Sequence, residues 1–228
     1  MTIKSMLFAA LAGAVLVTAS CGGKDDYNNN IAPEPPTPGK NTHKGPSVIF
    51  IGDSITWQWT RSGFHPEYFN THGYVNKGIS GNTTVQMNSR FEDDVIALDP
   101  YCVVIEGGTN DIAQFTDDSI LSRLEEMVDK ALEKKIDVVL GSIPPSNLFP
   151  KVPGFRPQDR IAPLNAKIKA LAASKGIVYA DYYSVLVDDE LGLKTEYQKD
   201  TVHPNKQGYL AMETVIEPIL AKILKNNN

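Results

Sequence analysis

The chain has 228 residues, and its 27 acidic residues outnumber the 22 basic ones to give a formal net charge of −5. A mildly acidic chain without a basic run is not expected to bind nucleic acid. Its four histidines and two cysteines show no zinc-ligand spacing. The length suits one domain with a sizeable core, even after an N-terminal targeting segment is set aside.

The first 20 residues have the pattern of an export signal. Lys4 gives a basic start, residues 6–17 are apolar but too few to cross a bilayer, and small residues precede Cys21. This order resembles a bacterial lipoprotein signal, in which Cys21 would carry the lipid. An ordinary secretory signal with an incidental cysteine is the alternative. We expect an exported protein that is held to the bacterial outer membrane through its N-terminal lipid alone.

Residues 21–46 have the composition of a disordered tether. They are rich in Asn, Pro, Gly and charge and contain almost no large apolar side chain. Within them, Lys24, Asp25 and Asp26 resemble the surface-export signal of Bacteroidetes lipoproteins, although a solvated charge cluster explains them equally well. Periplasmic and cell-surface locations therefore both stay open. The folded domain is expected to occupy residues 47–228.

From residue 47 onward, short apolar runs alternate with amphipathic segments. Runs without polar alternation are typical of parallel strands covered on both faces. We expect such strands at residues 48–51, 101–105, 136–140 and 177–179, with an additional short one at 74–76. Helices are expected at 119–134, from about 160 to 174, and from 206 onward, where Pro218 should kink the helix or start a new turn. This alternation predicts an α/β fold, a three-layer α/β/α sandwich.

A candidate nucleophile directly follows the first strand, in the string Gly52-Asp53-Ser54. A serine just past a buried strand, beside a glycine that permits a tight turn, is positioned for attack. Alone, the tripeptide more often marks an ordinary turn.

A candidate base lies near the C-terminus. His203 precedes the last helix, and Asp200 can fold back to accept its imidazole N–H, which fixes the tautomer and stabilises the imidazolium. For this pair alone, a polar turn leading into a helix is the simpler interpretation. Donors for a developing oxyanion would be the backbone N–H groups of Ser54 and Gly81 and the side-chain amide of Asn110. A turn glycine and a local side-chain cap are the alternatives for Gly81 and Asn110.

Aromatic side chains provide candidates for substrate binding. Trp57 and Trp59 closely follow the serine and could stack on a sugar or line an acyl pocket, although helix packing is expected for one of the two. The proline-rich segment 142–157, with Phe149 and Phe155, follows the 136–140 strand. It could form a wall of the site or a packed surface loop.

Four sequence blocks together carry a family resemblance: Gly52-Asp53-Ser54, Gly78-Ile79-Ser80-Gly81-Asn82, Gly107-Gly108-Thr109-Asn110-Asp111 and Asp200-Thr201-Val202-His203-Pro204. They resemble the SGNH hydrolases, also called the GDSL esterase/lipase family, over residues 47 to 225. The resemblance implies a flavodoxin-like, five-stranded parallel sheet. It also implies that Ser54 is the nucleophile, that Ser54, Gly81 and Asn110 form the oxyanion hole, and that Asp200 orients the base His203. The Gly-x-Ser-x-Gly string of ordinary α/β-hydrolases is absent.

We therefore expect a serine esterase that hydrolyses carboxylic esters through an acyl-enzyme, without a metal or cofactor. Its expected substrate is a small ester or an acylated glycan, with removal of short acyl groups, above all acetyl, from a carbohydrate as the preferred interpretation. A lipase or lysophospholipase acting on longer acyl esters is one alternative. A non-catalytic glycan-binding module on the same fold is the other. The sequence gives no indication of the oligomeric state.

Overall fold

Five parallel strands form the central sheet of the computed structural model, which describes residues 42–226. The predicted export signal, the predicted lipidation site Cys21 and most of the predicted tether lie outside these residues. The strand order is β2-β1-β3-β4-β5, as in the flavodoxin-like fold that the family resemblance implied. The strands are β1 (Val48–Gly52), β2 (Val75–Gly78), β3 (Cys102–Glu106), β4 (Asp137–Gly141) and β5 (Val178–Ala180). All five strands expected from the sequence are thereby confirmed.

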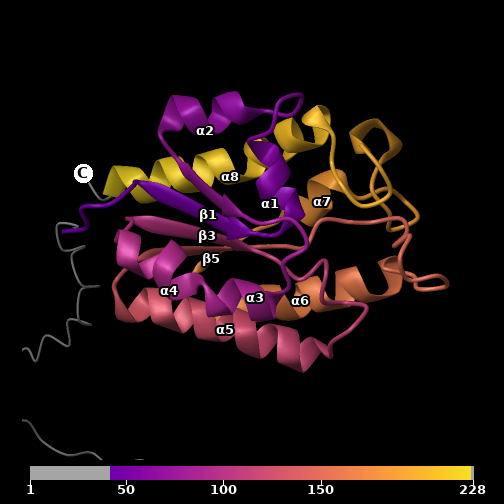
Figure 1. Ribbon diagram of the computed structural model, residues 1–228, viewed down its shortest axis with the longest axis horizontal. Coiled ribbons are helices and arrows are strands. Elements are labelled where there is room, and N and C mark those ends of the chain that lie inside the picture. The colour runs from indigo at the N-terminus through magenta and orange to yellow at the C-terminus, as the bar shows by residue number, and fades with distance from the viewer. Residues whose placement is uncertain (1–41, 227–228) are drawn as a thin grey trace, which may run out of the picture. The chain divides into compact units, whose positions relative to one another are not determined.

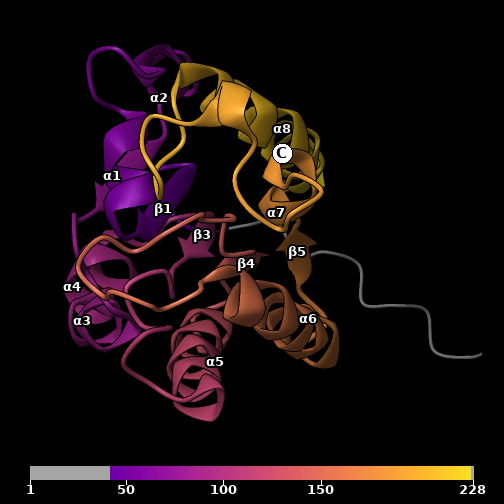
Figure 2. The ribbon, with the colours of Figure 1, turned by 90° about the vertical axis from the view of Figure 1, so that its right-hand side faces the viewer.

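Helices cover both faces of the sheet, as Figures 1 and 2 show. One layer contains α1 (Ser54–Trp59), α2 (Pro66–His72), α7 (Tyr182–Leu186) and α8 (Lys206–Asn226). The other contains α3 (Thr84–Ser89), α4 (Phe91–Asp94), α5 (Asp117–Glu133) and α6 (Gln158–Ser174). Two short 3₁₀ helices span Ile96–Leu98 and Thr195–Tyr197.

Alternate residues of the central strands supply two separate hydrophobic cores. Ile49 and Ile51 of β1 pack with the layer of α3, α4, α5 and α6, whereas Val48 and Phe50 pack with the layer of α1, α2, α7 and α8. Because successive side chains of a strand point to opposite faces, a strand covered on both sides must be apolar at every position. This is why the sequence shows continuous apolar runs.

The long helices lie close to their predicted positions. Thr116 caps α5 by accepting a hydrogen bond from the backbone N–H of Ser119, so this helix begins at Asp117, two residues earlier than expected. The last helix contains Pro218 without a break and runs from Lys206 to Asn226, so no new turn starts there. Flanking contacts explain this continuity, because Ile216 and Leu220 are fully buried in the core.

Residues 42–46, which the sequence assigned to the tether, contact the folded domain. The backbone N–H of Gly45 donates to the carbonyl of Asp99 over 2.9 Å, and that of Lys44 donates to the Asp99 carboxylate over 3.0 Å. The His43 ring donates to the carbonyl of Lys135 over 3.0 Å. The chain therefore joins the domain where β3 and β4 begin. Within residues 42–226, no helix is both long and apolar enough to span a membrane.

Candidate active site

The candidate nucleophile lies where β1 turns directly into α1. Asp53 caps this helix, because its Oδ1 accepts the backbone N–H of Ile55 over 2.8 Å. Gly52 has no room for a side chain, since a Cβ there would lie 2.6 Å from the carbonyl oxygen of Glu106. Ser54 is consequently the first residue of α1 and follows the carboxyl end of the strand.

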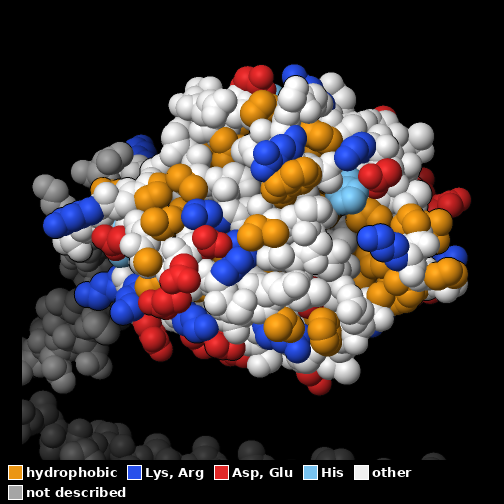
Figure 3. All heavy atoms as spheres, viewed as in Figure 1, with side chains coloured by type: hydrophobic (Ala, Val, Ile, Leu, Met, Phe, Trp, Pro, Cys, Tyr) orange, Lys and Arg blue, Asp and Glu red, His pale blue; other side chains and the backbone are white. Residues whose placement is uncertain are grey.

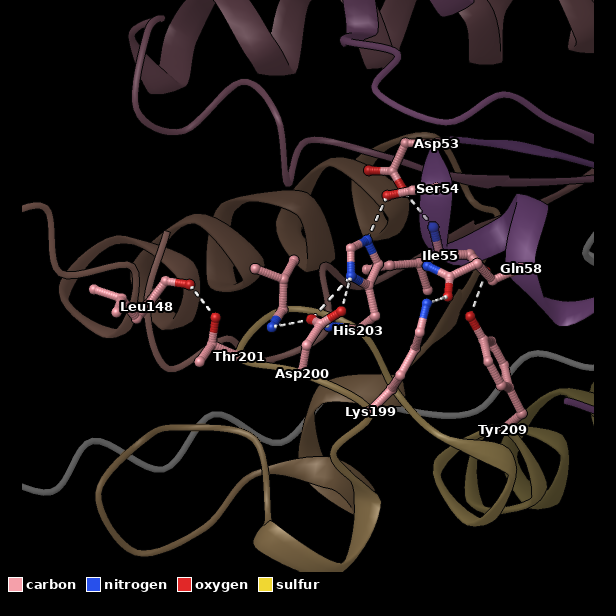
Figure 4. Close-up of polar contacts among 11 residues, drawn as sticks. Asp53, Ser54, Ile55, Gln58, Leu148, Lys199, Asp200, Thr201, His203 and Tyr209 are labelled. Atoms are coloured by element: carbon pink, nitrogen blue, oxygen red, sulfur yellow. Dashed lines mark hydrogen bonds and ion pairs between the residues drawn. The ribbon is translucent and has the colours of Figure 1, made fainter. Parts of the chain in front are cut away.

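Ser54, His203 and Asp200 form a continuous hydrogen-bonded array, which Figure 4 shows. Ser54 Oγ lies 2.9 Å from His203 Nε2. On the other side of the ring, His203 Nδ1 lies 2.9 Å from both carboxylate oxygens of Asp200. The array has the geometry that a serine nucleophile, its base and an orienting carboxylate require.

Asp200 is held in its ionised form by its own loop. Partial burial alone would raise its pKa. Hydrogen bonds from the backbone N–H groups of Val202 and His203, each 2.9 Å long, and from the His203 ring outweigh burial and lower the pKa below its ordinary value. The carboxylate can therefore accept the imidazole N–H at neutral pH.

Gly81 and Asn110 lie beside Ser54 on the wall of one cavity. Gly81 has a φ of 81°, a conformation that favours glycine, and no atom would contact a Cβ placed on it. The side-chain amide of Asn110 donates to the backbone carbonyl of Asn82 over 2.9 Å and makes a longer contact of 3.4 Å with Asp53 Oδ2. The three donors named from the sequence thus lie together.

The cavity has a volume of about 490 Å³ and lies at the carboxyl ends of the strands. Ser54 follows β1 and Asn110 follows β3, so the cavity lies at the point where the strand order reverses, the usual ligand position in such sheets. Figure 3 shows hydrophobic side chains gathered around a histidine at the right-hand end of the molecule. The apolar part of the lining comprises Ala113, Phe149, Pro150, Val152 and Val202, and the polar part outside the array includes Ser80, Thr109, Gln114, Lys151 and Thr201.

The sequence matches the family model of the GDSL-like Lipase/Acylhydrolase family over residues 50–211. The chain belongs to this family. As a GDSL-like hydrolase with this fold, it is a carboxylic ester hydrolase.

Several solved structures resemble this GDSL hydrolase. A GDSL-like lipase from Bacteroides thetaiotaomicron is 39% identical with a TM-score of 0.72, and the alignment covers 77% of this chain and 87% of that one. A Bacteroides fragilis protein assigned as an acylhydrolase is 36% identical with a TM-score of 0.75, covering 89% and 100%. A lipase/acylhydrolase from Enterococcus faecalis is 25% identical with a TM-score of 0.61, covering 77% and 96%. No curated protein sequence matches the chain.

Of the four aromatic candidates for substrate binding, only Phe149 lines the cavity of the GDSL hydrolase. Phe155 packs beside it, with the ring centroids 5.5 Å apart. Segment 142–157 contributes one wall of the cavity through Phe149, Pro150, Lys151 and Val152. Of the two interpretations of this segment, a wall of the site or a packed surface loop, the structure thus favours the first.

The two tryptophans belong to packing rather than to the cavity wall. Trp59 is 2% exposed, and its indole N–H donates to Glu213 of α8 over 2.9 Å. The Arg61 guanidinium lies 4.3 Å from the ring centroid of Trp57. Neither indole lines the cavity. Trp59 is directed toward α8, and Trp57 contacts the Arg61 guanidinium.

Three buried carboxyl groups, those of Asp53, Glu106 and Asp111, lie near one another around the carboxyl ends of β1 and β3, and the sequence analysis did not recognise them as a cluster. Burial, together with the negative charge of nearby Asp111, raises the pKa of Asp53 to about 7. Burial, with Asp53 nearby, also raises the pKa of Glu106 well above its ordinary value, although Thr56 donates a hydrogen bond to it over 3.1 Å. The only available signal was position, since Asp53 follows β1 and Glu106 ends β3.

Within residues 42–226, no group of three or more His, Cys, Asp or Glu side chains is arranged to hold a metal ion. The proposal that the hydrolase needs no metal or cofactor stays a prediction from the sequence.

Proposed function

We propose that Ser54 attacks the ester carbonyl, that His203 is the base, and that Asp200 orients His203. The single observation that supports these roles is the array at the cavity, in which Ser54 Oγ lies 2.9 Å from His203 Nε2 and Asp200 holds the opposite nitrogen. Serine is a weak nucleophile without a base at hydrogen-bond distance, and this geometry supplies one.

The reaction proceeds in two halves. Ser54 Oγ bonds to the carbonyl carbon while its proton passes to His203, and the negative oxygen accepts hydrogen bonds from Ser54 N–H, Gly81 N–H and the Asn110 amide. The C–O bond then breaks, and the alcohol leaves with the proton from His203. Water then attacks the acyl carbonyl and gives one proton to His203. When the resulting tetrahedral intermediate breaks its bond to Ser54 Oγ, His203 returns that proton to Ser54 and the carboxylic acid is released.

For the substrate, we propose a short acyl ester, above all an acetyl ester, of a carbohydrate. The composition of the cavity wall supports this choice. Ser80, Gln114 and Thr201 can hydrogen-bond to sugar hydroxyls, while Phe149 offers an apolar surface to a sugar face or an acyl methyl group. A long acyl chain would instead require an uninterrupted apolar surface.

Action on longer acyl esters, as a lipase or lysophospholipase, is the second candidate. The apolar side of the cavity, with Pro150, Val152 and Val202 next to Phe149, favours it. A non-catalytic glycan-binding role is the third candidate, and the complete array of Ser54, His203 and Asp200 argues against it.

We also propose that the protein is exported and lipidated at Cys21, and that the lipid anchors it to the outer membrane on the periplasmic or the external side. The order of basic, apolar and small residues before Cys21 supports this. Cells grown with labelled palmitate should yield a labelled protein, and Cys21→Ser should abolish the label. Protease treatment of intact cells then separates the two sides, since only a surface-exposed enzyme is cleaved.

The decisive experiment compares initial rates on p-nitrophenyl acetate, butyrate, octanoate and palmitate for the parent enzyme and Ser54→Ala. Ser54-dependent turnover that falls steeply beyond butyrate supports short-acyl hydrolysis and directs the next screen to acetylated sugars. A preference for octanoate or palmitate establishes the lipase alternative. A folded parent protein without turnover on any ester, but with measurable glycan binding, supports the binding module.

A further inference from the structure

One guanidinium group, that of Arg90, joins three segments behind the oxyanion donors. Arg90 lies between α3 and α4. Its Nη2 donates to the carbonyl of Gly52 at the end of β1 over 3.0 Å, and its Nη1 donates to the carbonyl of Lys77 in β2 over 2.7 Å. Its Nε donates to the side-chain oxygen of Asn82 over 2.8 Å. We call residues 79–83, between β2 and α3, the oxyanion loop.

The oxyanion loop is connected to Asn110 through the same asparagine. Asn82 is 9% exposed, and its backbone carbonyl accepts the Asn110 amide over 2.9 Å. The backbone N–H of Asn82 donates to the carbonyl of Ile79 over 3.1 Å. The backbone N–H of Ile79 in turn donates to the carbonyl of Gly52 over 3.1 Å. A displacement of Asn82 would therefore move both the Gly81 N–H and the Asn110 amide relative to Ser54.

The arrangement requires a planar fork with several donors. Arg90 uses Nε, Nη1 and Nη2 toward three acceptors at once, and it also pairs with Asp94 over 2.7 Å. A lysine ammonium on a flexible stem cannot reproduce this geometry. Burial alone would raise the pKa of Asp94, but hydrogen bonds from Arg90 and Lys77 lower it, so this carboxylate balances the charge of the guanidinium.

We propose that Arg90 is a positioning residue, which holds the oxyanion loop and, through Asn82, the Asn110 amide at the distance from Ser54 that the tetrahedral intermediate needs. The proposal rests on the function proposed above. Since these donors act most strongly on the negative oxygen of the transition state, loss of Arg90 lowers kcat rather than raising KM.

Arg90→Lys tests the proposal against Asp94→Asn as a matched control. We expect Arg90→Lys to lower kcat on p-nitrophenyl acetate roughly 10- to 100-fold with KM changed less than about threefold. Asp94→Asn removes the ion pairs of Asp94 with Arg90 and Lys77 but keeps the three hydrogen bonds from Arg90 to Gly52, Lys77 and Asn82, so its kcat should stay near that of the parent. A parent-like kcat in Arg90→Lys, or an equal loss in both variants, overturns the proposal.

A double-mutant cycle then tests the route through Asn82. Asn82→Ala removes the acceptor of Arg90 Nε, so Arg90→Lys should cost clearly less kcat in that background than in the parent. Additive losses would show that Arg90 acts elsewhere and would overturn the route.

Hydrogen exchange provides a readout that does not depend on turnover. Exchange in residues 79–83 should accelerate in Arg90→Lys and not in Asp94→Asn, and unchanged exchange in Arg90→Lys contradicts the proposal. If Ser54→Ala keeps the parent activity, the proposed function is wrong. The hydrogen-exchange result still tests whether Arg90 holds the oxyanion loop.

Discussion

Ser54 Oγ and His203 Nε2 lie 2.9 Å apart although 149 residues separate the two in sequence. The serine follows the carboxyl end of β1, and the histidine lies in the loop before α8. The sheet brings them together because the carboxyl ends of its parallel strands share one edge. The contact between Ser54 and His203 is therefore a product of the topology, whereas the hydrogen bond between Asp200 and His203 is formed within one loop.

Ser54→Ala should lower kcat by roughly 10³-fold or more while leaving the fold intact. The substitution removes the proposed nucleophile, and Ser54 contributes no side chain to either hydrophobic core. Steady-state kinetics with a purified variant, checked by circular dichroism and thermal melting, measure the effect. Turnover close to the parent rate would exclude Ser54 as the nucleophile.

Asp200→Asn should lower kcat by roughly 10²- to 10⁴-fold. Asparagine can present its N–H₂ group to His203 Nδ1, which favours the tautomer that cannot take the proton from Ser54. Asp159→Asn is the control, since Asp159 is exposed and pairs only with Arg156 among the described residues. If both variants kept the parent kcat, Asp200 would not be the group that orients the base.

Gly81→Ala should lower kcat at least about 10-fold through a change in the backbone. A Cβ at Gly81 meets no atom, but a φ of 81° is strained for alanine by roughly 1–2 kcal/mol, so the oxyanion loop relaxes and its N–H moves. Gly63→Ala is a matched control, because Gly63 has a φ of 88° and equally open surroundings, and it lies between α1 and α2, outside the oxyanion loop. Similar melting temperatures with a kcat loss only in Gly81→Ala would support the role. Equal kcat in the two variants would contradict it.

Asp53→Asn should flatten the pH dependence of stability between about pH 4 and 7. Burial raises the pKa of Asp53 from 3.8 to about 7, so folding favours its protonated form. The parent enzyme thus keeps this contribution at low pH and loses it, on the order of a few kcal/mol, as the pH rises through about 7. Glu106 shifts in the same direction and retains part of the slope.

Urea unfolding of Asp53→Asn and its parent at pH 4, 5.5 and 7 measures this slope. The exposed Asp189 provides the control variant Asp189→Asn, which should follow the parent curve. Parallel curves for the parent and Asp53→Asn would show that Asp53 is already ionised at acidic pH in the folded enzyme.

The sequence predicted the features that depend on local patterns. Apolar runs such as Val48–Ile51 marked the strands, and the spacing of Asp200 and His203 indicated a contact within one loop. The strand order followed from the family resemblance. Helices α1, α2, α3, α4 and α7 have four to seven residues, too few for a helical period to be recognised.

Contacts between distant segments could not be predicted in the same way. The sequence could not decide which of Trp57 and Trp59 packs inside the domain, because only the orientation of α1 determines which side of the helix meets α8. The role of Arg90 depends on β1, β2 and the oxyanion loop converging on one guanidinium, and no spacing in the sequence records that convergence.

Two hydrogen bonds made by side chains outside the cavity lining join helices α1 and α8. The Trp59 indole donates to Glu213 over 2.9 Å. The Tyr209 hydroxyl donates to the carbonyl of Ile55 over 2.8 Å, as Figure 4 shows. Ser54 begins the first of these helices, and His203 immediately precedes the second. The contacts that hold α8 against α1 therefore also fix the distance between the proposed nucleophile and base, so the packing of one hydrophobic core and the geometry of the array depend on the same two helices.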